Sequence, residues 1–332
     1  MHELAFPLLV GLIAIALAFD FLNGLHDAAN SIATVVSTRL LSPVWAVVFA
    51  AFGNFAAYWL VGLHVAETVG KGIIDKDAVT PAVVFGALVG AMFWNVVTWL
   101  KGIPSSSSHA LIGGLLGAGI AHGGFGVIES SGTTKTIIAI FLSPLLGFAL
   151  AMLMVLITSW VFKGFQPRRA EGVFKTLHLF SSAAYSISHG GNDAQKTMGI
   201  ITVLLYSTGQ LKGEFHIPEW VVISCYAAIA MGTMSGGWRI IKTMGTKLTK
   251  LNHHTGFSAS TAGSIVVFGA SYMGIPVSTT HAITGSVIGT GAARKASAVR
   301  WGIAGRVVTA WFITIPASAA VGAVFYVLTR MF

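Results

Sequence analysis

Charged side chains are scarce in this sequence: Asp, Glu, Lys and Arg make up 9% of the 332 residues, whereas 55% are hydrophobic. Soluble domains carry about 25% charged residues, so the composition excludes an ordinary soluble protein. Thirty-nine glycines and nine tryptophans favour an all-α polytopic membrane protein, because glycine lets helices pack closely and tryptophan is enriched at membrane interfaces. At about 20 residues per span, the length accommodates about ten to twelve transmembrane segments and no separate soluble domain.

Cysteine is also nearly absent, since Cys225 is the only one. This excludes an intramolecular disulfide framework and a cysteine-rich metal site, and we expect neither a resident metal nor a cofactor. The net charge of +9 does not predict nucleic acid binding, because the basic residues lie between apolar segments instead of gathering on a solvated surface. The apolar stretch 1–21 has no basic first segment, so it is predicted to be a membrane span and not a cleaved signal peptide.

Apolar stretches alternate with short polar connections along the chain, and most are long enough to cross a membrane. They occupy residues 4–20, 43–62, 81–100, 134–161, 174–188, 219–237, 257–273 and 301–329. Two shorter stretches, 104–123 and 276–292, are rich in Gly, Ser and Thr and follow the same tripeptide, Gly-Ile-Pro. We predict that these two form broken or half-helices.

Basic residues gather in three segments, 163–175, 239–250 and 294–300. The positive-inside rule makes these segments cytoplasmic in a plasma (inner) membrane. Counting spans backwards from the first segment places both termini of the chain outside. The helix that ends near Asn23 then starts outside, whereas the helix that ends near His189 starts inside.

This opposite orientation predicts two inverted repeats, 1–161 and 174–332, joined by a cytoplasmic connector at 162–173. In such a fold, the broken helices and half-helices of both repeats meet near the membrane midplane. The prediction therefore brings polar residues from distant parts of the chain to one place.

Two internal duplications support the repeats. Gly102–Gly114 and Gly274–Ser286 are identical at seven of thirteen positions. Phe21–Ser31 and Ile187–Thr197 share only Gly, Asp and Ala, but they are separated by nearly the same number of residues. Two motifs repeated in the same order at nearly one offset indicate duplication of the whole unit.

Three acidic residues, Asp20, Asp27 and Asp193, lie away from the loops. At about 2.5 to 3.5 kcal/mol per charge near the bilayer centre, three bare carboxylates would cost about as much as a protein's whole stability. They must therefore be paired or neutralised. Asp27 and Asp193 follow Asn23-Gly24 and Gly190-Gly191, which predicts a break in each helix at these glycines.

The simplest role for Asp27 and Asp193 is to cap the helix that follows each break. The functional alternative is binding of a cation or proton, because Asp27 and Asn30 share a helical face and offer oxygen ligands. At the matching position of the second copy stands Lys196. It can pair with Asp193 one turn back, or serve as a positive contact for an anion.

Hydroxyl side chains follow Pro104 and Pro276, residues that are favoured in the first turn of a helix. They are Ser105, Ser106, Ser107 and Ser108 in the first copy and Ser278, Thr279 and Thr280 in the second. Hydroxyls beside free N–H groups at the positive end of a helix form an anion site, and two such ends facing each other would enclose a tetrahedral oxyanion. The alternative is that they only cap helices or pack between them.

Three further residues are weaker candidates for carrying protons: His109, His281 and Asp20. Ser, His and Asp are also the components of an intramembrane serine hydrolase. Duplication argues against that enzyme, because catalysis needs one nucleophile, whereas binding on a pseudo-two-fold axis uses both copies. A passive anion channel is disfavoured because buried carboxylates repel anions unless a cation or proton travels with them.

These motifs resemble the signatures of the inorganic phosphate transporter (Pit) family. Asn23–Ser31 is similar to its N-terminal signature and Ser188–Lys196 to its C-terminal one, and both Gly-Ile-Pro segments match. The resemblance covers essentially the whole chain. It implies a secondary transporter that carries inorganic phosphate with a coupling cation, with Asp27, Asn30 and Asp193 and the neighbouring Asn192 in coupling roles.

The resemblance is to the bacterial low-affinity branch, where a lysine stands at the position of Lys196 and many other members carry Asn. That branch resembles a proton symporter of metal-phosphate, so H⁺ is the expected coupling ion, Na⁺ the alternative, and a divalent metal a candidate companion of phosphate. Membrane lipid is the expected surrounding, and a homodimer is left open. Sulfate permeases belong to the same family, but phosphate still carries a proton that a carboxylate can accept, which favours phosphate.

Overall fold

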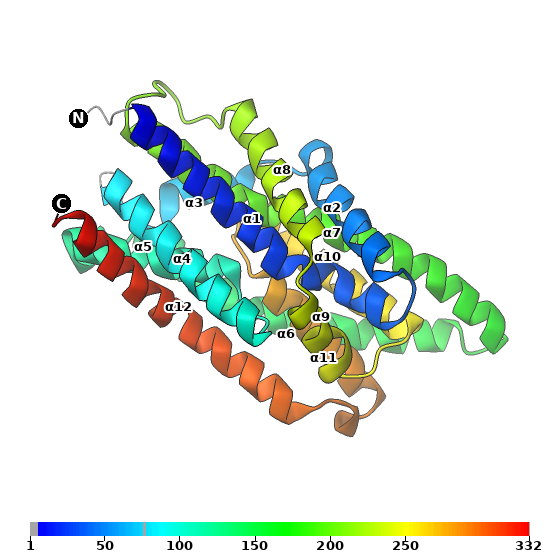
Figure 1. Ribbon diagram of the computed structural model, residues 1–332. Helices are drawn as coiled ribbons and strands as arrows, with labels where there is room; N and C mark the ends of the chain where they lie inside the picture. Colours follow the sequence, from blue (N-terminus) through cyan, green and yellow to red (C-terminus); the bar gives the residue numbers. More distant parts are fainter. Residues whose placement is uncertain (1–5, 76–77, 332) are drawn as a thin grey trace.

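The computed structural model describes residues 6–75 and 78–331, and in this part of the chain the fold is all-helical, with one isolated bridge between Ile74 and Ile128 and no strand. Its helices, drawn in Figure 1, are α1 (Phe6–Ser37), α2 (Pro43–Leu60), α3 (His64–Gly72), α4 (Pro81–Lys101), α5 (Ser107–Gly123), α6 (Ser130–Val161), α7 (Pro167–Ser207), α8 (Glu219–Ser235), α9 (Trp238–Lys242), α10 (His253–Tyr272), α11 (Thr279–Arg294) and α12 (Trp301–Thr329). A π-helical segment, Thr243–Lys247, follows α9.

Five of these helices, α1, α2, α4, α6 and α12, are long and apolar enough to cross a membrane. Helix α8 followed by α9 and the π-helical segment, bent by 63°, passes the same test when the two parts are counted together, as a broken span or a re-entrant loop. Large apolar side chains on α6 and α12 face outwards, for example Leu145 at 64% and Phe312 at 60% exposure. An apolar outer surface of this kind suits lipid, and the all-helical membrane fold predicted above is confirmed.

The two helices that carry the predicted acidic sites are continuous, so the predicted breaks at Asn23-Gly24 and Gly190-Gly191 are wrong. Instead, these glycines allow the backbones of neighbouring helices to approach closely. A Cβ atom on Gly24 would lie 2.2 Å from the carbonyl oxygen of Ile229, and one on Gly190 would lie 2.4 Å from that of Asn54. The backbone of each helix therefore touches its neighbour directly, and the helix hydrogen bonds stay intact.

Two helical hairpins, α4–α5 and α10–α11, contain the two stretches that the sequence predicts as half-helices. With 17 and 16 residues, α5 and α11 are about 25 Å long. At the tips, Gly102 and Gly274 adopt φ values of +64° and +66°. The N–H groups of the following isoleucines, Ile103 and Ile275, donate back to Thr98 and Ala270, which is a Schellman-type ending in both copies.

The prolines do not open the half-helices as predicted. Pro104 and Pro276 lie in the hairpin tips, whereas α5 begins at Ser107 and α11 at Thr279. Serine provides the cap in both cases: Ser106 accepts from the N–H of His109, and Ser278 accepts from the N–H of His281.

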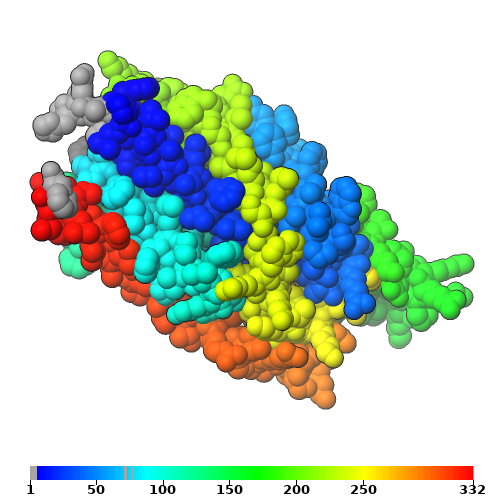
Figure 2. Space-filling model, in the orientation of Figure 1, coloured from blue at the N-terminus to red at the C-terminus, as the bar shows by residue number. Residues whose placement is uncertain are grey.

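The half-helices have matching neighbours. Helix α5 packs against α4 and α12, and α11 packs against α10 and α6. Helix α1 contacts α8, while α7 contacts α2 and α10, so elements from the two parts of the chain interleave. Figure 2 shows α1, α4 and the α8–α9 segment side by side on one face of the molecule.

Both ends of the described chain lie at one end of the bundle. The start of α1 and the end of α12 are close together in Figure 1. The α6–α7 and α11–α12 connections lie at the opposite end, and these connections carry two of the basic segments noted in the sequence. Helix α7 begins at Pro167, so the last residues of segment 162–173 are already helical.

Candidate functional site

The structure brings the two motif carboxylates together in the interior. Asp27 on α1 is 2% exposed and Asp193 on α7 is fully buried. Together with His189, which is also on α7, they offer three ligand atoms that all lie within 4.8 Å of one another. Two carboxylates and an imidazole at this spacing are a donor set that can hold a cation or share a proton.

Around Asp27, polar side chains come from α1, α4 and α11. One carboxylate oxygen lies 2.7 Å from Nδ1 of His26, whose Nε2 lies 3.0 Å from the hydroxyl of Thr98. The other oxygen accepts from Thr280 at 3.4 Å. Thr280 in turn accepts from the side-chain amide of Asn30 at 2.9 Å, which leaves the carbonyl oxygen of that amide without a donor.

Around Asp193, the second copy of the motif forms an ion pair. The ammonium of Lys196 donates to Asp193 at 2.5 Å, to Ser108 at 2.5 Å and to the backbone carbonyl of Val277 at 2.9 Å. Thr279 donates to the other carboxylate oxygen at 3.0 Å. The predicted Lys196–Asp193 pair is thus present, and all three ammonium protons have acceptors.

The surroundings of Asp27 and those of Asp193 form two half-sites, which are related by the duplications. Thr280 beside Asp27 and Ser108 beside Asp193 occupy equivalent places in the two Gly-Ile-Pro copies. Thr280 is on α11, so the α1 motif is completed by the hairpin that follows α7, while the α7 motif also uses the hairpin that follows α1. The N-terminal end of α11 therefore bonds to both carboxylates, whereas that of α5 reaches Asp193 through Lys196.

The first turns of α5 and α11 keep donors available at this point. The caps Ser106 and Ser278 satisfy the N–H groups of the third helical residues, and the two preceding N–H groups of each helix have no partner in the helix ladder. The Ser107 hydroxyl is buried and has no hydrogen-bond partner within the described residues. Ser105 differs, because it bonds to Thr314 at 2.8 Å and to the Trp94 indole.

The remaining predicted residues lie around this centre. His109 and His281 meet edge to face with ring centroids 4.4 Å apart, and His281 stacks on Trp311 at 3.8 Å. Asn192 donates to Ser271 at 2.9 Å. The histidine contacts join α5, α11 and α12, and the Asn192 bond joins α7 to α10.

Sequence reasoning overlooked three residues that touch the site: His26, His189 and Tyr185. His189 lies 3.3 Å from Asp193 and 3.0 Å from Asn54, and the Tyr185 hydroxyl donates to the Thr279 carbonyl at 2.9 Å. The signal for His189 was in the sequence, since it precedes Asp193 by one helical turn and therefore shares its face.

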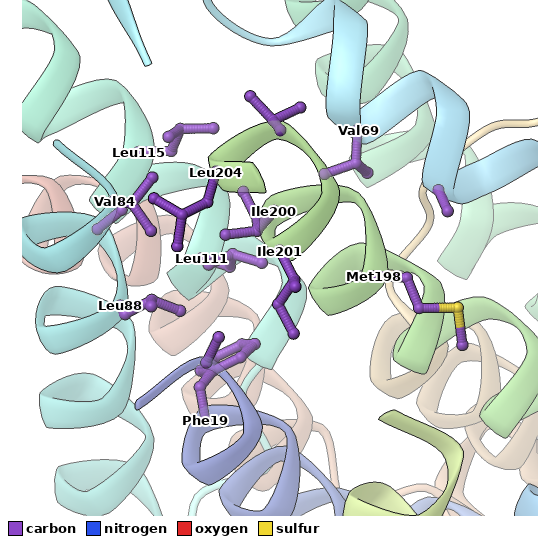
Figure 3. Close-up of a cluster of buried hydrophobic side chains, with 14 of the residues drawn as sticks. Phe19, Val69, Val84, Leu88, Leu111, Leu115, Met198, Ile200, Ile201 and Leu204 are labelled. Atoms are coloured by element: carbon purple, nitrogen blue, oxygen red, sulfur yellow. The ribbon is translucent and has the colours of Figure 1, made fainter. Parts of the chain in front are cut away.

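Two hydrophobic clusters enclose the site. The terminus-side cluster is built from the first half of α1, from α3, α4 and α5, and from the second half of α7. Its members include Phe19, Leu88, Leu111, Ile201 and Leu204 (Figure 3). The opposite cluster uses the second half of α1 together with α10 and α11. Asp27 and Asp193 lie between the two clusters, so the site is closed at both ends.

Comparison with known proteins gives consistent matches. A model of the phosphate transporter family matches residues 23–322. A probable low-affinity inorganic phosphate transporter of Rhizobium meliloti (strain 1021) is 63% identical, with 97% of each chain covered. A protein of the same description from Bacillus subtilis (strain 168) is 42% identical over 95% of each chain.

A solved structure described as the sodium-dependent phosphate transporter has the same fold, with a TM-score of 0.87 at 24% sequence identity. It covers 98% of this chain and 100% of its own. The relatives are named as transporters, which is a non-enzymatic role, so the prediction that the chain is no enzyme is confirmed and the hydrolase alternative is dropped.

Proposed function

Because this chain belongs to the phosphate transporter family, we propose that it carries inorganic phosphate across the inner membrane by secondary active symport with protons. The observation that carries this proposal is the convergence of two buried carboxylates with the N-terminal end of α11 directly, and with that of α5 through Lys196. One group attracts cations and the other attracts anions, and a symporter needs both in one place.

Phosphate would bind at the first turns of α5 and α11. Ser107, Ser108, Thr279 and Thr280 lie there with their backbone N–H groups, and helix N-termini favour anions through their dipoles. Lys196 adds a positive charge beside Ser108. In the present conformation its protons are all used, so contact with phosphate would require one of them to leave its acceptor.

Proton coupling would act through Asp27 and Asp193. A deprotonated pair next to phosphate is repulsive, and a proton shared between carboxylate and phosphate removes that repulsion. Sulfate has no proton to give, so the same groups favour phosphate. If the carried species is metal-phosphate, the Asp27, His189 and Asp193 atoms are placed to receive the metal of that substrate.

The matching neighbours of α5 and α11 support an inverted-repeat architecture. The basic connections at one end of the bundle and both ends of the described chain at the other (Figure 1) support a topology in which the termini lie outside. Each half-site would then open towards one side of the membrane in turn.

The direct test is uptake of labelled phosphate into proteoliposomes under an imposed pH gradient or an imposed Na⁺ gradient, with sulfate as competitor. We expect accumulation driven by the pH gradient, little competition by sulfate, and loss of accumulation in Asp27→Asn and Asp193→Asn. Glu129→Gln, at an exposed position before α6, is the matched acidic control. Accumulation driven by Na⁺ alone, or wild-type rates in both aspartate variants, would refute proton coupling.

A further inference from the structure

An apolar groove on the outer surface lies apart from the paired carboxylates. It has a volume of about 600 Å³ and is lined by side chains of α6, α11 and α12. On both walls the lining side chains are partly exposed, for example Phe141 on α6 at 50% and Val308 on α12 at 37%. The groove therefore opens sideways, on the same apolar surface of α6 and α12 that suits lipid.

The two walls of the groove belong to different packing units. Helix α6 packs against α10 and α11, whereas α12 packs against α4 and α5. Rings make contact between the two units: the centroids of Phe141 and Phe312 lie 5.8 Å apart, and those of His281 and Trp311 lie 3.8 Å apart. Because these bulky rings keep the backbones of α6 and α12 apart, an open channel remains beside them.

The dimensions of the groove match one leaflet of a membrane. Its lining residues on α12 extend from Trp301 to Ile315, which is about 21 Å at 1.5 Å per residue. The hydrocarbon core of a bilayer is about 30 Å thick, so the groove is longer than the depth that the acyl chains of one leaflet fill. Trp301 marks one end of it, and tryptophan is enriched where hydrocarbon meets the headgroups.

Positive charge gathers at the end of the groove that Trp301 marks. Arg300 precedes Trp301, and the Trp301 indole donates to the carbonyl of Ala296 at 2.9 Å, which brings Lys295 to the same place. Lys295 and Arg300 are exposed and have no acidic partner among the described residues. No acidic residue follows Glu219 in the sequence. The charge here is complementary to an anionic lipid headgroup at the same depth.

We propose that this groove binds an anionic phospholipid, with one acyl chain between α6 and α12 and the headgroup at Lys295 and Arg300. A second copy of the chain fits less well, because a symmetric contact through this face would bring like charges together. The lipid would touch α11, since His281 lines the groove and directly follows Thr280, which bonds to Asp27. Binding of the lipid does not depend on the ion that drives transport.

The headgroup is tested by native mass spectrometry of the full-length protein after removal of lipid. Phosphatidylglycerol, which is anionic, and phosphatidylcholine, which is neutral, are added back with the same acyl chains. We expect the wild type to bind phosphatidylglycerol preferentially, and Lys295→Gln combined with Arg300→Gln to weaken this binding about tenfold or more. The control is Arg306→Gln, because Arg306 is exposed but lies two residues before Val308 and so faces away from the groove.

The acyl chain is tested by filling the groove. Val308→Trp places a large side chain in it and should weaken binding of phosphatidylglycerol about tenfold or more. Ile313→Trp is the control, because Ile313 is 47% exposed on the same helix but does not line the groove, and it should bind like the wild type. If Val308→Trp does not fold, the Lys295 and Arg300 variant decides the question.

Equal binding of the two lipids by the wild type, or equal binding of phosphatidylglycerol by Val308→Trp and Ile313→Trp, would overturn the proposal. It would also be overturned by a dimer that Val308→Trp dissociates, since the groove would then be an interface between two copies of the chain. Failure of wild-type proteoliposomes to accumulate phosphate would refute the proposed symport and leave the lipid site standing.

Discussion

At the scale of single residues, Lys196 connects three parts of the site. Its ammonium joins α7 to the start of α5 through Ser108 and to the tip of the second hairpin through Val277. It also neutralises Asp193 at 2.5 Å. Removal of one partner of a buried pair leaves an uncompensated charge, which is far costlier than loss of an exposed pair.

We therefore expect Lys196→Met to lower the free energy of unfolding by about 3 to 5 kcal/mol and to abolish phosphate uptake. Thermal or denaturant unfolding in detergent, with uptake on the same preparation, measures both. The matched control is Lys175→Met. Lys175 also pairs with an acidic residue one helical turn before it, Glu171, but its side chain is 51% exposed. We expect this variant to lower the free energy of unfolding by at most about 0.5 kcal/mol. Equal losses in the two variants would contradict the role given to Lys196.

The sequence predicted the Asp27, Asp193 and Lys196 cluster because the duplication marks these positions, and the ion pair follows from helical spacing. It did not predict which hydroxyl each carboxylate meets, because that depends on how the hairpins cross between the two halves of the chain. His26 contacts Thr98, far along the chain, and such a pairing has no local signature.

At the scale of helices, glycine is where sequence reasoning was most misleading. Gly24 and Gly190 predict helix breaks because glycine weakens helices in isolation. In the packed molecule each glycine permits the backbone of a neighbouring helix to approach closely. The stabilisation from this packing outweighs the low helix propensity of glycine. By contrast, most ends of the apolar helices were predicted to within a few residues, since hydrophobicity sets them directly.

Replacement of Gly24 by alanine should destabilise the protein by about 1 to 3 kcal/mol, as expected for overpacking, because the added Cβ would lie 2.2 Å from the Ile229 carbonyl oxygen. Gly11→Ala on the same helix is the control. Nothing lies within 4 Å of a Cβ there, so alanine should be neutral or stabilising by up to about 1 kcal/mol. Unfolding temperatures in detergent report both, and similar values for the two variants would contradict direct backbone packing.

At the scale of the whole molecule, the site is enclosed between two hydrophobic clusters. Transport would require the enclosed carboxylates to become accessible from each side of the membrane in turn. Sequence predicted the two halves but not the enclosure, because closure depends on the joint packing of α1 and α7 with both hairpins.

The topology can be checked with a membrane-impermeant thiol reagent. Cys225 is buried and can be replaced by alanine to give a cysteine-free background. Lys212→Cys, in the connection before α8, should be labelled in intact cells, whereas Lys163→Cys, in the connection before α7, should be labelled only after permeabilisation. Both positions are exposed. Labelling in the opposite order would invert the proposed orientation.

The central claim is that the anion binds where the two half-helices meet the paired carboxylates. A cryo-EM or crystallographic map of the protein with bound phosphate tests it most directly. The account predicts tetrahedral density within hydrogen-bond distance of the first turns of both α5 and α11, next to Asp27 and Asp193. Density at one half-helix alone, or at a place remote from both carboxylates, would contradict it.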